Sequence, residues 1–574
     1  MKRCPKCNRP ENDDSLAFCR ADGTRLVSDG SFVSEGAGTL RFDSAPDIGE
    51  FDTRILPTGE GLRRPTAPTT VLDKQPAAGG TQELGKPKSR RGILIAVAAV
   101  VAAAIAVSSY LYLSRKVNSA IDSVVVLPFQ NMSGDPNLEY LSDGVTESLI
   151  NSLSQLPNLA VKARSTAFRY KGKESDPQKV GSELNVQAVL SGRMVQRGDD
   201  LTLSLDLVDT RTGNQLWGGQ YNRKLTDLVA LQGEIARDVS NRLRITMLGA
   251  DEQRMTKSYT GNAEAYRLYL LGRFYWDKRT PKDLRKAAEY FQQAVAFDSD
   301  YALAYAGLAD AYTMLPVYGG APSREVLPKA REAALKALSQ DGELAEAHIS
   351  LGLVLHFYDY DFAGAEREFK AAIGLSPNNA TAHQFYGNLL FQLGRHEESS
   401  TEFRRALEIE PLMLTSNRLY GLSLLYARKY DEAVAQLKRT LELDASFAPA
   451  HDSLAQVYFV KGSYAESVEE FAKSQELSGE PQNAALARES FARAGWQGFL
   501  QAMTGEPRPA KLTSYSAATF HAALGEKDKA FAALNKAYED REFYISLLKV
   551  DQRLDTLRTD SRFADLLRKV GLLQ

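Results

Sequence analysis

Between residues 262 and 540 the pattern of apolar residues repeats every 34 residues. One place in each unit holds a small residue, and sixteen residues later a large apolar residue follows. The small residues are Gly387, Gly421 and Ala455, and the large ones are Phe403, Leu437 and Phe471. A small residue lets one helix approach its partner closely, the large residue fills the gap between them, and a proline such as Pro411 ends the unit. The pattern predicts helix-turn-helix units stacked into a solenoid.

A 34-residue helical period is typical of tetratricopeptide repeats. Less regular units flank these three, so we expect six to eight units, followed by capping helices over residues 541–574. The first helices of such units line the concave face of a superhelix, and their side chains predict proteins or peptides as partners. Some of these side chains could instead contact the next repeat. The residues expected to bind a partner are Gln384, Asn388, Phe391, Gln392, Arg418, Leu422, Tyr426, Asp452, Gln456 and Phe459.

Residues 120–250 alternate between strand-like and helix-like stretches. Ser123–Phe129 is an apolar run of strand length, residues 159–170 predict a second strand, and Thr226–Met247 predicts a final helix. Between them we expect a short helix over 177–186 and a hairpin that turns at 198–200. The face of the first helix is marked by Leu141, Val145, Leu149 and Leu153. The order β-α-β-α-β-β-α predicts a mixed sheet with helices on one face.

Three strings in this region carry a family resemblance. They are VVVLPFQNMSGDPNLEYLSDGVTESLINSLSQLPNL, ARSTAFRYKGK and QLWGGQYNRKLTDLVALQGEIA. The region resembles the periplasmic TolB amino-terminal-like (FlgO-related) domain. In that family the domain is often tethered to a membrane helix and followed by tetratricopeptide repeats, and relatives carry an adenylate cyclase, a protein kinase or a winged-helix domain on the cytoplasmic side. The resemblance implies a non-catalytic domain that receives a signal or docks a partner.

An uncharged stretch, Ile93–Leu113, is 21 residues long. At 1.5 Å per residue such a helix crosses a hydrocarbon core of about 30 Å. More Lys and Arg residues precede the stretch than follow it, which predicts a cytoplasmic N-terminus. We therefore expect a single-pass inner-membrane protein whose C-terminal domains are extracytoplasmic or periplasmic. Small residues at every fourth position favour close helix contact and a possible homodimer, and these are Ala98, Ala102 and Ala106.

The first 27 residues hold all three cysteines of the chain. Their spacing resembles the two knuckles of a zinc ribbon, with Asp22 in place of a fourth cysteine. The candidate Zn²⁺ ligands are Cys4, Cys7, Cys19 and Asp22. A degenerate ribbon without metal is the alternative. Residues 28–90 are rich in Pro, Gly and polar residues, which predicts a disordered linker, and its Thr66, Thr69 and Thr70 are candidate phosphorylation sites.

The remaining residues give little sign of catalytic chemistry. His348, His383 and His451 occupy one equivalent place in three repeats, which favours a packing role. The series Asp135, Glu139, Asp143 and Glu147 surrounds a predicted helix start, where acids cap a helix and oppose its dipole, although a calcium or acid/base site is conceivable. The formal net charge of −2 gives no reason to expect a nucleic-acid partner.

Together these features predict a multidomain chain: a small zinc ribbon, a single transmembrane helix, an α/β TolB-like domain and an all-α tetratricopeptide-repeat solenoid. The predicted function is that of a membrane-anchored interaction scaffold or sensor without enzymatic activity. One alternative is a membrane-integrated transcription regulator or a signalling accessory protein. The other is an enzyme with an unrecognised site in residues 122–248.

Overall fold

The chain forms two units, residues 1–95 and 96–574, in a computed structural model. In the first unit, strand β1 pairs antiparallel with β2 and β3, in the order β2-β1-β3. These strands are β1 (Lys2–Arg3), β2 (Pro10–Glu11) and β3 (Val27–Ser28). The structure describes these three strands and residues 121–156, 159–243, 257–505 and 512–573.

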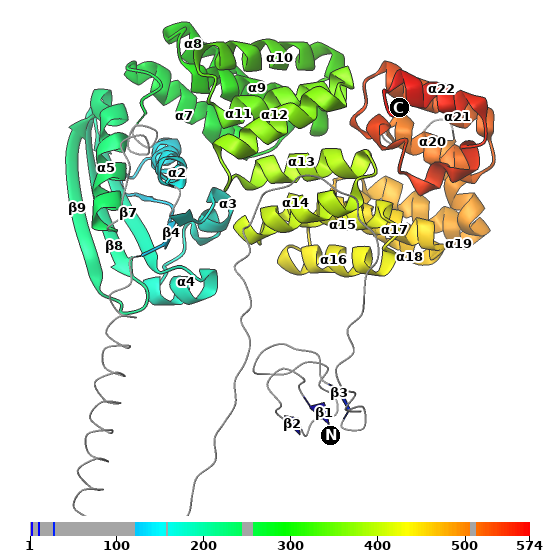
Figure 1. Cartoon of the computed structure of the whole chain (residues 1–574), viewed down its shortest axis with the longest axis horizontal. Coiled ribbons are helices and arrows are strands. Elements are labelled where there is room, and N and C mark those ends of the chain that lie inside the picture. The colour runs from blue at the N-terminus through cyan, green and yellow to red at the C-terminus, as the bar shows by residue number, and fades with distance from the viewer. Residues whose placement is uncertain are drawn as a thin grey trace, which may run out of the picture. The chain divides into compact units, whose positions relative to one another are not determined.

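The second unit begins with a mixed sheet in the order β6-β4-β7-β8-β9, in which β5 also pairs with β7 (Figure 1). Strand β4 is parallel to β6 and β7, whereas β7, β8 and β9 are antiparallel. The alternate leucines of β8 are buried and the residues between them are half-buried or exposed, so one face of the sheet is covered. The strands are β4 (Ser123–Val126), β5 (Gln130–Asn131), β6 (Ala160–Val161), β7 (Ala188–Arg197), β8 (Asp200–Asp209) and β9 (Gln215–Lys224).

The helices of this region are α2, α3, α4 and α5, with short 3₁₀ turns η1, η2 and η3. The bounds are η1 (Pro136–Leu138), α2 (Glu139–Ser154), α3 (Arg164–Ala167), η2 (Phe168–Tyr170), α4 (Pro177–Leu184), η3 (Leu225–Asp227) and α5 (Leu228–Arg242). All four leucine and valine positions that mark the predicted face of α2 are buried. The expected helix at Thr226–Met247 corresponds to η3 and α5.

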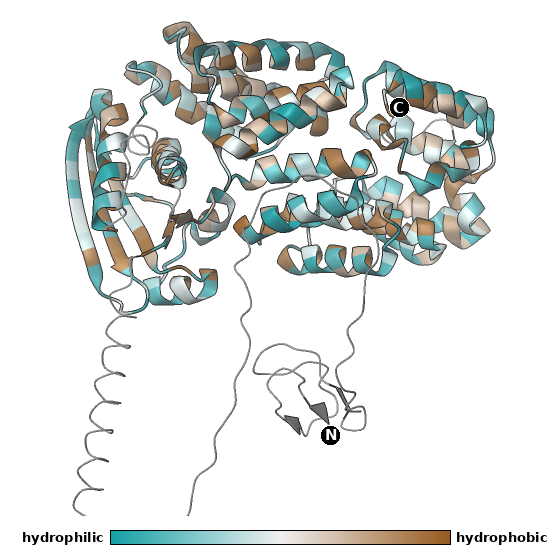
Figure 2. Ribbon diagram, in the orientation of Figure 1, coloured by the Kyte–Doolittle hydropathy of each residue, from teal (hydrophilic) through white to brown (hydrophobic). Residues whose placement is uncertain are grey.

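Two sequence predictions for the sheet are wrong. Residues 159–170 form only the two-residue strand β6, and the chain then turns into α3 and η2. Arg164, the first residue of α3, pairs with Glu147 of α2 at 3.1 Å, and this tertiary contact accompanies the turn. The sequence also missed β9 as a separate strand. This strand lies at the edge of the sheet and is mostly exposed, so its hydropathy shows no regular alternation (Figure 2).

Helix pairs follow the sheet region, and six consecutive pairs run from α7 to α18. The first four helices are α7 (Ala263–Asp277), α8 (Pro281–Phe297), α9 (Ala302–Val317) and α10 (Ser323–Gln340). Then come α11 (Ala345–Val354) with the π turn η4 (Leu355–Asp359), α12 (Phe362–Leu375), α13 (Ala380–Gln392) and α14 (His396–Ile409). The last are α15 (Leu414–Tyr426), α16 (Tyr430–Leu443), α17 (Ala448–Lys461) and α18 (Tyr464–Leu477). We number these pairs units 1 to 6.

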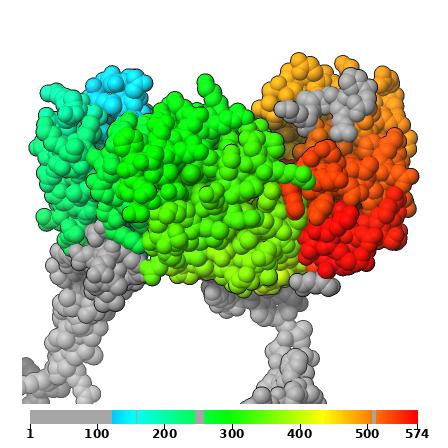
Figure 3. All heavy atoms as spheres, turned by 90° about the horizontal axis from the view of Figure 1, so that it is seen from above, coloured from blue at the N-terminus to red at the C-terminus, as the bar shows by residue number. Residues whose placement is uncertain are grey.

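The C-terminal part contains a long helix, a further pair and two 3₁₀ turns. These are α19 (Pro481–Thr504), α20 (Ser514–Ala523), α21 (Lys527–Glu539), η5 (Phe543–Leu547), η6 (Gln552–Leu557) and α22 (Ser561–Lys569). In residues 541–573, the region predicted to form capping helices, η5 and η6 precede α22. Figure 3 shows this red segment lying against the green and yellow repeats.

The small and large residues of the period pack against each other as predicted. A Cβ atom built on Gly352 would lie 2.6 Å from a ring carbon of Phe369, and one on Gly421 would lie 2.7 Å from Leu437. Such distances are shorter than van der Waals contact, so a larger residue in the first helix would force the two helices apart. The close approach of the helices in each pair therefore depends on these small residues.

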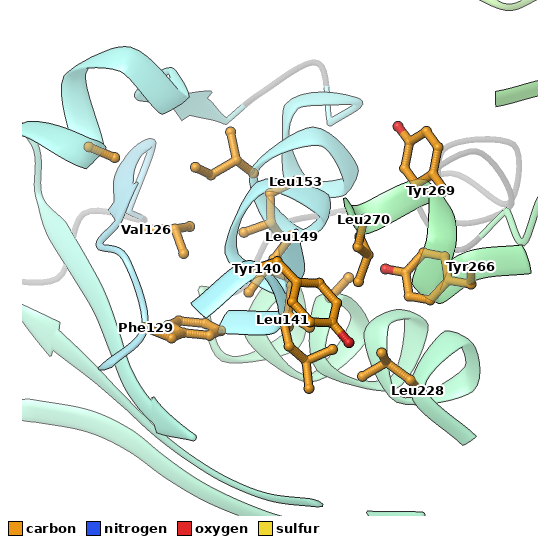
Figure 4. Packing of buried hydrophobic residues seen from close by; sticks show 14 of the residues in the cluster. Val126, Phe129, Tyr140, Leu141, Leu149, Leu153, Leu228, Tyr266, Tyr269 and Leu270 are labelled. Carbon is orange, nitrogen blue, oxygen red and sulfur yellow. The ribbon is translucent and has the colours of Figure 1, made fainter. Parts of the chain in front are cut away.

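The sheet region and the first repeats share one hydrophobic core. Helix α2 lies between the sheet and α7, and its Gly144 would place a Cβ only 2.8 Å from Leu270 of α7 (Figure 4). The hydroxyls of Ser148 and Tyr266 are hydrogen-bonded across this junction at 3.0 Å. Because α2 is covered on both sides, the α/β region and unit 1 form a continuous structure.

The prediction of a single-pass membrane protein needs correction. Across the described residues, every helix is either too short or too polar to span a bilayer. The two longest, α10 and α19, carry charges such as Lys329, Arg331 and Arg488. This finding contradicts the predicted inner-membrane location with periplasmic C-terminal domains. The stretch Ile93–Leu113, on which the membrane contact and the possible homodimer depended, lies outside the described residues.

Candidate protein-binding groove

The predicted partner-binding residues lie on the first helices of units 4, 5 and 6. On α13 and α15 most of them are buried, and the buried residues are Gln384, Asn388, Phe391, Gln392, Leu422 and Tyr426. The half-buried ones are Arg418 of α15 and Asp452, Gln456 and Phe459 of α17. Only the second set is therefore accessible to a partner in this structure.

The buried amides of α13 and its neighbours are bonded within the array. Gln384 accepts hydrogen bonds from Thr415 and Ser416 of the next unit, each at 2.9 Å. Gln392 donates to Asn388 at 2.7 Å and accepts from His356 of the preceding unit, also at 2.7 Å. These residues thus contact the adjacent repeats, which is the alternative to partner binding that the sequence left open.

His356 lies at the centre of this amide network. Its ring is completely buried and stacks on Phe357 with centroids 3.9 Å apart. Burial lowers the pKa of His356 to about 3, although the hydrogen bond to Gln392 opposes the shift. A neutral ring donates through one nitrogen, and here Nε2 donates to the Gln392 carbonyl oxygen. The network is therefore uncharged and rigid, which suits packing and not proton transfer.

The C-terminal segment, residues 543–557, contacts the repeats at one end of the expected groove. The ring of Phe543 lies 4.3 Å from that of Phe357 in unit 3. Gln552 donates to the carbonyl oxygens of Leu425 and Tyr426 at the end of α15, at 3.4 and 3.0 Å. The sequence interpretation missed this contact, because the segment lacks the repeat period. Its unusual content of apolar residues, as in ISLL at 545–548, was the available signal.

An accessible polar region remains beside the segment. Arg418 donates to Ser453 at 3.3 Å, and its Nε is buried without a hydrogen-bond partner. Asp452 accepts a hydrogen bond from Gln456 at 2.8 Å, and the ring of Tyr544 in η5 is 46% exposed. The Nε atom itself is out of reach of a partner, but the side chain of Arg418 is only half-buried, and a guanidinium group is suited to bind a carbonyl or carboxylate oxygen. These residues could therefore contact a protein partner.

A buried ion network connects the α/β region to unit 1. Glu147 of α2 accepts from Arg164 of α3 at 3.1 Å and from Arg273 of α7 at 2.6 Å, and its side chain is 7% exposed. Arg164 also pairs with Asp277 at 2.7 Å. Burial opposes ionisation of Glu147, but the two guanidinium groups outweigh it and hold the pKa of Glu147 below its usual range. Burial raises the pKa of Asp310, 3.7 Å from Arg273, to about 6.

The acidic series around the start of α2 is explained by pairing. Asp135 caps η1 by accepting from the backbone of Asn137, and Glu139 lies in the first turn of α2, as expected. Asp143 and Glu147 instead form ion pairs with basic side chains. Lys171 pairs with both Glu139 and Asp143, and Arg164 and Arg273 pair with Glu147. Within the part of the chain that the structure describes, no group of three or more His, Cys, Asp or Glu residues could hold a metal. The predicted zinc ligands Cys4, Cys7, Cys19 and Asp22 lie outside that part.

Comparisons with known proteins assign the two regions separately. The model of the HilA/YgeH-like transcriptional regulator second domain matches residues 120–237, and tetratricopeptide-repeat models match 356–412 and 420–481. The TolB-like resemblance is a different assignment for the same region and stays a prediction. Among solved structures, YrrB, described as a TPR protein with an unusual peptide-binding site, is 22% identical with a TM-score of 0.25. The match covers 35% of this chain and 99% of the YrrB chain.

Two curated relatives match larger parts of the chain. A Rhizobium meliloti protein named "Putative adenylate cyclase 3" is 33% identical over 234 residues, which are 41% of this chain and 40% of that protein. The transcriptional regulator HilA of Salmonella typhimurium is 25% identical over 281 residues, 48% of this chain and 49% of that protein. The chain thus spans less than half the length of either relative. The matching repeat models and the helix pairs together show that the C-terminal region consists of tetratricopeptide repeats.

Proposed function

We propose that this protein is an interaction scaffold whose tetratricopeptide repeats bind a protein partner. The observation that carries the proposal is the half-buried set of polar and aromatic residues on α15 and α17, where Arg418 has a buried Nε without a partner. Tetratricopeptide repeats commonly present the first helices of their units to peptides. The chain itself acts by binding in this proposal and not by catalysis.

In this proposal the α/β region is held in a fixed position relative to the repeats. Its shared core with unit 1 and the ion pairs of Glu147 hold the two regions in one arrangement. A ligand or partner of the α/β region would therefore be presented at a constant position relative to the repeats. The TolB-like resemblance adds a signal-receiving or docking role for this region to the proposal.

A regulatory role is the second candidate. It is supported by the match of residues 120–237 to the second domain of HilA/YgeH-like transcriptional regulators and by the similarity to HilA. In this version the partner in the groove would belong to the transcription machinery. The zinc ribbon predicted for residues 1–27 would then be a second attachment point, with Zn²⁺ held by its three cysteines and Asp22.

Site-specific photo-crosslinking in the full chain tests the proposal. A photoreactive phenylalanine derivative replaces Phe459 in the groove, which leaves Arg418 in place, and a matched variant carries it at Lys438, which is exposed on α16. We expect a protein adduct of defined mass from position 459 and none from position 438. Equal labelling from both positions, or none from either, would exclude the groove as a binding site. The identity of the adduct separates the two candidates, because a transcription factor or polymerase subunit would favour regulation.

A further inference from the structure

The C-terminal segment, residues 543–557, contacts the ends of the first helices in three successive units. Phe543 packs on Phe357 in unit 3, and Gln552 and Asp555 reach the end of α15 in unit 5. Between them, Lys549 approaches Gly394 after α13, where a Cβ atom would lie 4.0 Å from its Cε. The segment therefore crosses units 3, 4 and 5 in order.

Its contacts have the chemistry of a bound peptide. The last carbonyl groups of a helix have no partner within the helix, and Gln552 supplies donors to two of them on α15. Arg428, directly after α15, pairs with Asp555 at 2.9 Å. Ile545, Leu548 and Leu554 are fully buried in a hydrophobic cluster that the C-terminal region shares with the repeats. One carboxamide, one acid and several aliphatic anchors thus hold the segment on the array.

The repeat period shows that two residues of the array are unusual where they meet the C-terminal region. Places 360, 394, 428 and 462 are 34 residues apart, and all four have positive φ. Gly394 and Gly462 adopt this conformation easily, whereas Tyr360 and Arg428 do so with strain. Arg428 binds Asp555, and Tyr360 stacks on Tyr538 with ring centroids 5.9 Å apart. Both strained residues thus contact the C-terminal region.

The charges of the segment are mostly neutralised within the C-terminal region. Arg553 pairs with Asp551 at 2.7 Å, and both side chains are buried. Arg558 pairs with Asp555 at 2.6 Å, and Tyr515 of α20 donates to Asp551 at 3.0 Å. Release of the segment from the repeats would therefore leave these ion pairs intact. In addition, 3₁₀ turns have poorer hydrogen-bond geometry than α-helices.

We propose that residues 543–557 are the resident ligand of the repeat array, and that a protein partner binds units 3 to 5 by replacing them. The partner that fits carries a short apolar segment with a carboxamide followed three residues later by an acid, as in Gln552 and Asp555. This inference rests on the proposed function, since it assigns the regulation and the ligand chemistry of the same groove.

A peptide with the sequence of residues 541–560, fluorescently labelled, serves as the probe on the full-length chain. The resident segment competes with the peptide, so the apparent affinity of the wild-type chain is reduced by the fraction of molecules that are open. A Gln552→Ala/Asp555→Ala variant loses the polar contacts of its own segment, and we expect it to bind the peptide at least tenfold more tightly than wild type. The matched control Asp565→Ala, on α22 and paired with Arg568, should bind as wild type does.

Addition of Arg428→Ala to the double variant tests the other side of the contact. It removes the partner of the peptide's own acid, so peptide binding should weaken severalfold. Unchanged binding would show that the peptide lies elsewhere and would overturn the inference. Far-UV circular dichroism and thermal unfolding report whether the variants keep their fold.

Hydrogen exchange of the wild-type chain provides a test that needs no variant. We expect the amides of residues 543–557 to exchange through an opening that leaves α13 and α15 protected. The segment would be a permanent part of the core if its amides exchanged only when α13 and α15 unfold with it and if the double variant also failed to bind the peptide. Adducts from position 459 in that case would retain the proposed function while excluding the exchange of ligands.

Discussion

His348 has a hydrogen-bonding geometry that predicts a raised pKa. Its Nδ1 lies 2.6 Å from a carboxylate oxygen of Glu368, and its Nε2 lies 3.1 Å from the carbonyl oxygen of Gly342. A neutral imidazole can donate through only one nitrogen, so two acceptors favour the protonated ring. The hydrogen bond to Glu368 raises the pKa of His348, burial opposes the shift, and the Gly342 carbonyl adds to it.

This shift makes a contribution to stability that depends on pH. Because the folded pKa is raised, the contribution is complete below the unfolded pKa of about 6.5 and is lost as the pH rises through the folded pKa. A Glu368→Gln substitution replaces a charge-assisted hydrogen bond by a neutral one, which differs by about 1 kcal/mol. That energy corresponds to about a fivefold change in the protonation equilibrium, so the pKa of His348 should fall.

The assay is an NMR titration of the full chain with ¹³C-labelled histidine Cε1 atoms. The chain has six histidines, which makes assignment by substitution practical. We expect the His348 signal to titrate above pH 6.5 in wild type and at lower pH in Glu368→Gln. Glu408→Gln is the control, since this carboxylate is 65% exposed and pairs with Arg405. A wild-type His348 that titrates at or below 6.5, or one unaffected by loss of Glu368, would refute the reasoning.

Three further predictions concern packing, charge and metal. Gly352→Ala should destabilise the array by about 1–3 kcal/mol in urea unfolding, because its Cβ atom would lie 2.6 Å from a ring carbon of Phe369. Gly387→Ala should cost clearly less, since its Cβ atom would lie 3.2 Å from the nearest ring carbon. Equal losses of stability in the two variants would contradict this reasoning. Glu147→Gln removes a buried carboxylate from two half-buried arginines, Arg164 and Arg273, and should cost about 3 kcal/mol. A loss below about 1 kcal/mol would argue against the network. The purified full chain should contain one equivalent of zinc by mass spectrometry of the metal, and Cys7→Ser should abolish it; metal-free wild type would favour a degenerate ribbon.

The repeat period predicted those features of the fold that depend on neighbours in the sequence. Gly387 and Phe403 meet because both lie in one helix pair, and their spacing alone determines this contact. The three histidines at one equivalent place were expected to pack, and in the structure His383 and His451 bind a glutamate of the second helix as His348 does. In unit 5 the same place holds Asn417, which accepts a hydrogen bond from Gln436.

The sequence could not predict contacts between parts of the chain that share no period. The short strand β6 ends where Arg164 turns toward Glu147, and Glu147 is then bound by Arg273, which is 126 residues away. The edge strand β9 gave no alternating pattern because its residues are mostly exposed. In both cases tertiary contacts determine the local structure, and local propensity is only a weak guide to it.

The buried half of the predicted groove illustrates the same limit and shows where a signal can be found. The period correctly placed Gln384 and Tyr426 on first helices, but it carries no information about a segment more than a hundred residues later. The information lies instead in departures from the period. A position that must adopt positive φ favours glycine, so a tyrosine or arginine there costs about 1–2 kcal/mol that other contacts must offset. Tyr360 and Arg428 are two such positions, and their partners Tyr538 and Asp555 belong to the C-terminal region. At these two places of the repeat, where units 4 and 6 hold Gly394 and Gly462, the residue that departs from glycine lies at a contact with the C-terminal region.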